Sequence, residues 1–213
     1  MRSEVSRPPP VRGPPRGASP LARAAPLVPI PVVSAGGFTI WITGLSGAGK
    51  STIGRGVAAE LERRGRTVEY LDGDIVRTHL SRGLGYTREA RDTNIERIGW
   101  VASRLTRHGA AVVVAAISPY DAARRRARAL VEAHGPFVEV WAKARVEACA
   151  ERDVKGLYAR AYAGEIEHFT GVNDPYERPE DAEVVADTEH MTPAESIALV
   201  LVELERRGIL APA

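Results

Sequence analysis

A glycine-rich run that ends in a lysine and a serine carries the clearest chemistry in this chain of 213 residues. The run begins at Gly44 and fits the pattern G-x-x-x-x-G-K-[ST], with Gly49, Lys50 and Ser51 at the last fixed positions. Glycines let a backbone wrap closely around phosphate oxygens, because they carry no Cβ atom. Successive N–H groups and the start of the next helix then face the anion. We expect Lys50 to reach the β- and γ-phosphates of a nucleotide and the Ser51 hydroxyl to ligate Mg²⁺.

Two aspartates, Asp72 and Asp74, follow a short strand predicted over 68–71. Acids at the carboxyl end of a strand in a parallel sheet lie over the phosphate site. Positioning and charge stabilisation carry most of the rate in phosphoryl transfer. We therefore expect Asp74 to orient an acceptor hydroxyl and take its proton late, and Asp72 to lie nearer the metal. The plainer alternative is an Asp-Gly turn that only caps the next helix.

A long helix is predicted over 87–108, with a buried stripe formed by Ile95, Ile98, Ala102 and Leu105. Arg91 and Asn94 fall on the same stripe, near the start of the helix. Buried polar groups need partners, and an anionic ligand would satisfy Arg91, with Arg77 beside it. The alternative is an internal salt bridge from Arg91 to Asp72 or Asp74.

The elements that position these residues alternate between strands and helices. Buried strands are predicted over 38–43, 68–71, 111–117, 137–141 and 184–186, and helices over 50–64, 87–108, from 145 to 152 and from a capping box at Thr192 onward. This alternation indicates an α/β protein with a mainly parallel five-stranded sheet. Ser118 ends the third strand at the rim of the same cleft, or else caps the following helix. The arginines of that helix are expected in solvent: Arg124, Arg125, Arg126 and Arg128.

The polar, glycine-containing and aromatic segment from about 153 to 176 is typical of a lid. Only three of the 29 basic residues are lysines, and one of them, Lys155, falls in this segment. A lysine in so arginine-rich a chain marks a position that requires a compact point charge. We therefore expect Lys155 to face an anionic substrate.

Residues 1–35 form a Pro- and Arg-rich tail that is predicted to be disordered, followed by one domain over 36–213. The tail is best explained as a solvated extension, and an organelle transit peptide is the alternative. Residues 1–31 carry a net charge of +4, so the rest of the chain carries −2, which argues against a nucleic-acid-binding body. No apolar run approaches the length of a membrane span. The lone cysteine, Cys149, suits a cytoplasmic protein and is expected in the core.

Several blocks in one order resemble the adenylylsulfate kinase (APS kinase) family over about residues 36–207. They are Gly-Leu-Ser-Gly-Ala-Gly-Lys-Ser-Thr (44–52), Leu-Asp-Gly-Asp-Ile-Val-Arg (71–77), Leu-Gly-Tyr-Thr-Arg-Glu-Ala-Arg-Asp-Thr-Asn-Ile (84–95), Ile-Ser-Pro-Tyr (117–120), Lys-Gly-Leu-Tyr (155–158), Gly-Glu-Ile (164–166), Phe-Thr-Gly (169–171) and Asp-Pro-Tyr-Glu (174–177). The first block alone indicates only a P-loop nucleotide-binding protein, whereas the whole set is specific.

The resemblance implies a three-layer P-loop kinase that uses ATP and Mg²⁺ to phosphorylate the ribose 3′-hydroxyl of adenosine 5′-phosphosulfate (APS). It also implies a homodimer that takes this small molecule rather than a nucleic acid or a membrane. Asp74, Lys50, Asp72 and Ser118 would serve the reaction, although Ser118, described in the family as phosphorylated, is not claimed as an obligatory intermediate. The residues implied for ATP are Gly44, Leu45, Ser46, Gly47, Ala48, Gly49, Lys50, Ser51 and Thr52. Those implied for APS are Asp74, Arg77, Tyr86, Arg91, Asn94, Ile117, Ser118, Lys155, Phe169 and Thr170, with Tyr86 and Phe169 stacking on the adenine.

The chain departs from the family pattern at Tyr86, where a phenylalanine is usual, and at Ala90 and Glu96. These departures leave the acceptor open, so the alternative function is a P-loop kinase of another small hydroxyl-bearing metabolite. A switch GTPase is disfavoured because the chain has no N-K-x-D base-recognition motif.

Overall fold

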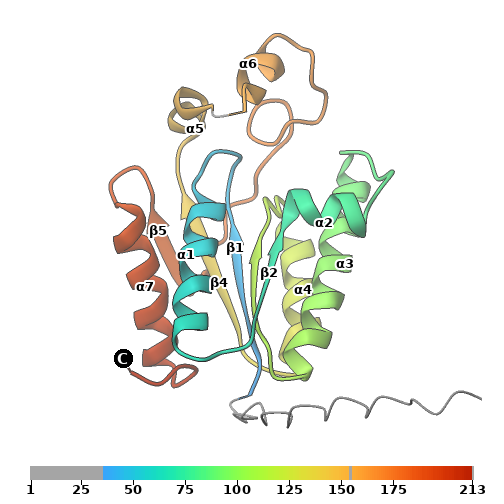
Figure 1. The fold of residues 1–213 in the computed structure, drawn as a ribbon. Helices are drawn as coiled ribbons and strands as arrows, with labels where there is room; N and C mark the ends of the chain where they lie inside the picture. The colour runs from blue at the N-terminus through green and yellow to red at the C-terminus, as the bar shows by residue number, and fades with distance from the viewer. Residues whose placement is uncertain (1–35, 154, 213) are drawn as a thin grey trace, which may run out of the picture. The chain divides into compact units, whose positions relative to one another are not determined.

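The computed structural model describes residues 36–153 and 155–212, so the predicted tail over 1–35 lies outside the described residues. The described residues form one five-stranded sheet with all neighbouring strands parallel, in the order β2-β3-β1-β4-β5 (Figure 1). Its strands are β1 (Phe38–Thr43), β2 (Val68–Asp72), β3 (Ala111–Ala115), β4 (Phe137–Lys143) and β5 (Val184–Asp187). The predicted α/β class and parallel sheet are confirmed.

Seven helices connect and cover these strands in the described part of the chain. They are α1 (Lys50–Arg63), α2 (Gly73–His79), α3 (Arg88–Arg107), α4 (Asp121–Glu132), α5 (Val146–Arg152), α6 (Leu157–Tyr162) and α7 (Pro193–Arg206). Helices α1 and α7 lie on one face of the sheet, and α3 and α4 lie on the other (Figure 1). This is the three-layer arrangement expected from alternating strands and helices.

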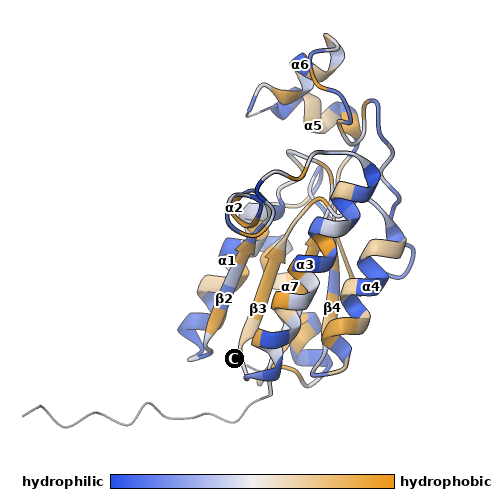
Figure 2. Cartoon of the chain, turned by 90° about the vertical axis from the view of Figure 1, so that its right-hand side faces the viewer, coloured by the Kyte–Doolittle hydropathy of each residue, from blue (hydrophilic) through white to orange (hydrophobic). Residues whose placement is uncertain are grey.

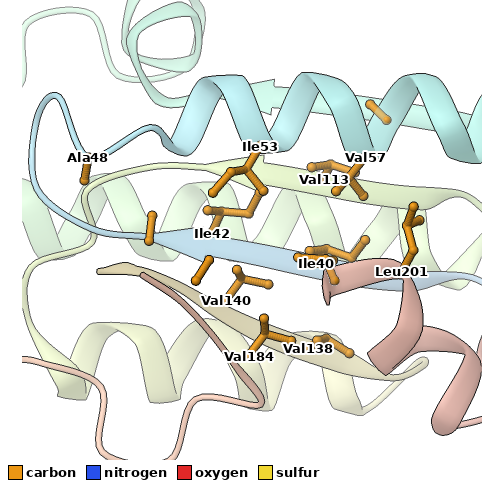
Figure 3. Packing of buried hydrophobic residues seen from close by; sticks show 14 of the residues in the cluster. Ile40, Ile42, Ala48, Ile53, Val57, Val113, Val138, Val140, Val184 and Leu201 are labelled. Carbon is orange, nitrogen blue, oxygen red and sulfur yellow. The ribbon is translucent and has the colours of Figure 1, made fainter. Parts of the chain in front are cut away.

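Two hydrophobic clusters hold the layers together, one on each face of the sheet. In β1, Ile40 and Ile42 belong to the cluster beneath α1 and α7, whereas Trp41 belongs to the cluster beneath α3 and α4. Successive strand side chains point to opposite faces, so a central strand must be apolar on both. Figure 3 shows the first cluster, in which Ile53 and Val57 of α1 pack against the strands. Figure 2 shows the apolar strands between polar outer helix faces.

Local capping interactions set where several helices begin. For α7, the sequence predicted this start at the Thr192 capping box. Thr192 accepts a hydrogen bond from the backbone N–H of Glu195, whose carboxylate accepts one in return from the backbone N–H of Thr192, and Pro193 is the first helical residue. Thr87 caps α3 in a similar way, accepting from the backbone N–H of Ala90 at 3.3 Å.

Strands β2 and β5 each end one residue beyond the prediction, and β3 and β4 differ by two residues. Strand β3 ends at Ala115 rather than at Ile117, and beyond that end the Ile117 carbonyl accepts the Thr43 hydroxyl at 2.6 Å and the backbone N–H of Gly44 at 3.5 Å. Strand β4 continues to Lys143, two residues beyond the predicted end, because β5 pairs with it as far as Asp187.

The segment after β4 lies beyond the carboxyl ends of the strands, where α5 and α6 stand above the sheet (Figure 1). This part includes most of the predicted lid, whose helix is α6. None of the helices in the described ranges combines the length and the apolar character needed to cross a lipid bilayer.

Candidate active site

The loop from Gly44 to Gly49 joins β1 to α1 and turns its backbone toward a cavity. Gly44 and Gly49 have φ angles of 150° and 88°, which side chains rarely allow. A Cβ atom at Gly44 would also stand 2.5 Å from the carbonyl oxygen of Ala142. The side chains of Leu45 and Ala48 are buried in the core below the loop. The loop therefore presents backbone N–H groups and the start of α1, which is an arrangement that binds phosphate.

Lys50, the first residue of α1, stands at the mouth of this loop. Its ammonium donates a hydrogen bond to the carbonyl oxygen of Leu45 at 2.7 Å. Burial lowers the pKa of Lys50 from its ordinary value to about 8, against the opposing effects of nearby groups that include Asp74 and Asp72. The desolvated Lys50 ammonium donates to a neutral carbonyl oxygen, so its charge is available to a phosphate group that binds in the loop.

Asp72 caps the next helix with one carboxylate oxygen and contacts Ser51 of the phosphate loop with the other. One carboxylate oxygen accepts the backbone N–H of Asp74 at 3.0 Å and so caps α2. The other accepts the Ser51 hydroxyl at 3.3 Å and the Tyr70 hydroxyl at 3.4 Å. The helix-capping alternative is thus correct for one oxygen, and the second oxygen lies beside the phosphate loop.

The Ser51–Asp72 pair offers Mg²⁺ one hydroxyl and one carboxylate oxygen. Within 36–153 and 155–212, no three histidine, cysteine, aspartate or glutamate side chains gather as a metal site. Mg²⁺ prefers oxygen ligands and, in nucleotide sites, takes one or two from the protein and the rest from phosphates and water. These two residues therefore fit a nucleotide-bound magnesium ion rather than a metal held by the protein alone.

Asp74 and Lys155 meet across the cavity, although 81 residues separate them in the chain. The Lys155 ammonium donates to an Asp74 carboxylate oxygen at 2.5 Å, and this bond raises the pKa of Lys155. Both side chains are largely exposed, at 75% for Asp74 and 62% for Lys155. An exposed ion pair contributes little to stability, so either side chain is free to change partner when a ligand enters.

Arg91 and Asn94 are buried on α3, as predicted, with relative exposures of 7% and 5%. Arg91 donates to the carbonyl oxygen of Tyr86 at 2.8 Å and to that of His168. No ion pair joins Arg91 to Asp72 or Asp74, so the salt-bridge alternative is wrong. Burial, followed by the charge of Arg77, lowers the pKa of Arg91. The Asn94 Oδ1 atom is buried with no hydrogen-bond partner among the described residues.

Ser118 lies just beyond the end of β3, in a loop that buried groups hold from several sides. Its φ angle is 47°, and its hydroxyl accepts the Trp41 indole N–H at 3.0 Å. The alternative that Ser118 caps α4 is wrong, because the N-cap is Tyr120 and Glu177 accepts the N–H of Asp121 at 2.7 Å.

Arg124 corrects the prediction that the arginines of α4 are solvated. Its side chain is 2% exposed, and it donates to the Ser118 carbonyl oxygen at 2.8 Å. Its Nε atom lies 2.8 Å from a carboxylate oxygen of Glu139 on β4. The pattern misled because four arginines in five residues indicate a solvated face, whereas Arg124 points to the sheet. Arg128 is also only 22% exposed, pairs with Glu183 at 2.9 Å and lies over the Phe137 ring.

One cavity of about 300 Å³ joins these features. Predicted residues from every part of the site line it: Ser46, Gly47, Gly49, Lys50, Ser51, Thr52, Asp72, Asp74, Arg77, Tyr86, Arg91, Asn94, Ile117, Ser118 and Lys155. Gly44, Leu45, Ala48, Phe169 and Thr170 are not in its lining. Phe169 is instead buried, with its ring edge-on to Tyr158 at 4.9 Å between centroids.

Seven further residues line the cavity, and two of them, Tyr158 and Asp153, bring polar side chains to it. Tyr158 donates from its hydroxyl to the Ser46 carbonyl oxygen at 2.9 Å and so ties α6 to the phosphate loop. Asp153 accepts the backbone N–H groups of Tyr158 and Ala159. The cue for Asp153 was an aspartate ahead of a glycine and a helical stretch, which is a capping signal. Nothing in the local pattern links Tyr158 to a loop 112 residues earlier.

Comparisons with known proteins agree with this geometry. The model of the adenylylsulphate kinase family matches residues 36–187. The chain is 54% identical over 172 residues to an adenylyl-sulfate kinase of Synechococcus sp. (strain JA-2-3B'a(2-13)), covering 81% of this chain and 97% of that protein. It is 51% identical over 175 residues to the adenylyl-sulfate kinase of Myxococcus xanthus, covering 82% and 94%.

Among solved structures, the APS kinase of Mycobacterium tuberculosis in complex with AMPPNP and APS superposes with a TM-score of 0.77 at 39% identity. That match covers 79% of this chain and 98% of the other. The family match over residues 36–187, the shared fold and relatives above 50% identity over nearly their whole length leave one family. The chain belongs to the adenylylsulphate kinase family.

Proposed function

We propose that this chain transfers the γ-phosphoryl group of ATP to the ribose 3′-hydroxyl of APS, giving ADP and 3′-phosphoadenosine 5′-phosphosulfate. The observation that carries the proposal is the shared cavity. Lys50 at the phosphate loop lines the same space as Asp74, Arg77 and Arg91. A phosphate-binding loop thus faces an acid and two cationic groups that an anionic acceptor could satisfy.

The donor half of the site would hold ATP by its phosphates. The backbone N–H groups over 44–50 and the start of α1 attract the anion, and Lys50 adds a full charge beside the β- and γ-phosphates. Ser51 and Asp72 would hold Mg²⁺, which neutralises charge on the phosphates when bound. The relative from Mycobacterium tuberculosis was solved with an ATP analogue and APS, which supports this pairing of substrates.

The acceptor half would hold the phosphosulfate and the ribose. Arg91 bonds only to carbonyl oxygens within the described chain, and Asn94 presents an unpaired buried oxygen, so both have capacity for a ligand. Binding a two-charge anion between Arg77 and Arg91 would remove the repulsion between them. This is why a sulfated nucleotide suits the cavity better than a neutral sugar.

Asp74 would orient the acceptor hydroxyl and accept its proton as the new P–O bond forms and the bond from the γ-phosphorus to the bridging oxygen of ADP breaks. For this, Asp74 must exchange its bond to Lys155 for the hydroxyl. Lys155 would then turn to the anionic substrate as the segment over about 153–176 closes and excludes water.

Three finer properties belong to the same proposal. The enzyme would require Mg²⁺, act as a homodimer and reside in the cytoplasm. The lone Cys149 is buried and suits a reducing compartment. The structure of a relative from Thiobacillus denitrificans is described as a hexameric APS kinase, so sizing the purified chain in solution is a direct check.

The test is a comparison of acceptors with the purified full-length chain. ADP release is followed with ATP, Mg²⁺ and either APS or AMP, which lacks the sulfate. We expect kcat/KM for APS to exceed that for AMP by at least about 10²-fold, because AMP leaves buried charged groups unpaired. Turnover of another hydroxyl compound without turnover of APS would instead favour the alternative kinase.

A further inference from the structure

Arg77, Tyr86 and Arg91 form a compact cluster on the acceptor side of the cavity. The Arg77 guanidinium carbon lies 4.4 Å from the centroid of the Tyr86 ring, and that of Arg91 lies 5.4 Å from it. All three residues line the cavity. Both distances are within the range of cation–π attraction, so one aromatic ring faces two cations.

The two guanidinium groups have no carboxylate partner within the described ranges. Arg77 donates to the carbonyl oxygens of Leu84 and Gly85, at 3.4 and 3.1 Å. Arg91 donates to the carbonyl oxygens of Tyr86 and His168. Two like charges on one side of a cavity repel each other, and the charge of Arg77 contributes to the lowered pKa of Arg91. The ring is the attractive group that both share.

A ring and a carboxylate would hold these arginines with different consequences. A carboxylate would neutralise them and compete with an incoming anion. The face of an aromatic ring attracts a cation through its quadrupole, carries no net charge and leaves the guanidinium N–H groups free to bond. The cluster is therefore built to keep two positive charges in place and available.

We propose that Tyr86 is a positioning residue that sets specificity for an anionic acceptor, because its ring contacts both Arg77 and Arg91 without neutralising their charge. The inference rests on the proposed function and deepens it, because it names the sulfate and phosphate end of the acceptor as the part that Tyr86 controls. The rival role for Tyr86 is stacking on the acceptor's adenine, which would leave a bare anion unaffected.

The test separates the two roles by using inorganic sulfate, which has no base to stack. Sulfate is titrated calorimetrically into the full-length chain at constant ionic strength, with ADP saturating the phosphate loop. We expect Tyr86→Leu to weaken sulfate binding by about tenfold, the loss of two cation–π contacts, and Tyr86→Phe, which keeps the ring, to restore binding to within about twofold of the unchanged chain. Trp100→Leu is the matched control, because Trp100 is an exposed aromatic beside Arg104 that does not line the cavity.

Unchanged sulfate affinity in Tyr86→Leu would overturn the inference, as would an equal loss in Tyr86→Phe. Because Tyr86 is 54% exposed, its replacement does not empty the core, and a thermal melt of each variant checks the fold. Tyr86→Gln, a second ring-free variant, must weaken sulfate binding as well. The assay needs no turnover, so ring-dependent sulfate binding in a chain that fails to phosphorylate APS would refute the proposed function while sustaining this inference.

Discussion

Asp74 is the residue on which the proposed proton transfer depends most directly. We expect Asp74→Asn to lower kcat by about 10²–10⁴-fold, because the amide cannot accept the hydroxyl proton. The affinity for ATP should stay within about threefold, since the phosphate loop is intact. Asp181→Asn, at an exposed position outside the cavity lining, is the control. A variant Asp74→Asn with the original kcat would remove this residue from the chemistry.

Lys50 should make nucleotide binding depend on pH near neutrality. Its pKa is lowered to about 8, so the ammonium loses its proton as the pH rises through that value, whereas an ordinary lysine keeps it to about 10. Since the charged form attracts phosphate, affinity for AMPPNP should be level below about pH 7 and fall by up to about tenfold per pH unit above 8.

Calorimetry in two buffers of different ionisation enthalpy tests this expectation. At pH 8, binding should take up a proton, because a bound phosphate raises the pKa of Lys50. Lys50→Arg, which stays charged, should bind less well overall and lose the pH dependence. An affinity that stays level to pH 9.5 would contradict the account.

At the scale of elements, the buried contact between α4 and β4 positions the loop that lines the cavity. Arg124 joins Glu139 of β4 to the Ser118 carbonyl oxygen. Burial raises the pKa of Glu139 against the opposing charge of Arg124, so removing the arginine leaves a costly buried carboxyl group. We expect Arg124→Met to lower the free energy of unfolding by about 3 kcal/mol and to raise the KM for APS.

Arg125→Met is the matched control on the same helix. Arg125 pairs with Asp121 at 2.6 Å, and its side chain is 68% exposed. Such a pair contributes at most about 1 kcal/mol. Urea denaturation of both variants measures the difference, and equal losses would show that the Arg124 contact does not hold the loop.

The elements themselves were largely predictable, because their signals are local. The β-prone run at 38–43 and the capping box at Thr192 are complete within a few residues, and both were confirmed. The end of β3 was not predictable, because the apolar run continues to Ile117, whereas the Ile117 carbonyl bonds to Thr43 and Gly44, which lie far away in the sequence. The prediction that the α4 arginines are solvated was wrong for a related reason, since only the positions of Glu139 and Glu183 show that Arg124 and Arg128 turn inward.

Part of the candidate site was predictable, because the carboxyl ends of parallel strands lie at the same edge of the sheet. Asp74, Arg91 and Asn94 come to one cavity because parallel strands and their helices all present one end there. The position of Tyr158 in the site was not predicted, because this residue reaches the phosphate loop from the segment above the sheet. The sequence also predicted that Tyr86 contacts the acceptor, but it did not show that two guanidinium groups lie against the Tyr86 ring.

At the scale of the whole molecule, ion pairs on the helices and the sheet should make the free energy of unfolding depend on pH in acid. The pKa values of Glu60, Glu203 and Asp187 are each lowered to about 2, chiefly by hydrogen bonds to Arg63, Arg206 and Lys143 respectively. Their unfolded values lie near 4, so their stabilising effect is complete above about pH 5 and is lost as the pH falls toward 2.

Urea midpoints at pH 7, 5 and 3 test this dependence. We expect little change from pH 7 to 5 and a clear loss by pH 3. In Glu203→Gln the loss between pH 5 and 3 should be smaller, because one titrating group is gone. An identical loss in the variant would show that this carboxylate does not contribute.

The most direct test of the proposed reaction is to identify its products. The full-length chain is incubated with ATP, Mg²⁺ and APS, and the nucleotides are separated and analysed by mass and by ³¹P NMR. We expect ADP and 3′-phosphoadenosine 5′-phosphosulfate in equal amounts. Release of ADP without a 3′-phosphorylated product, or no consumption of APS, would contradict the proposed reaction.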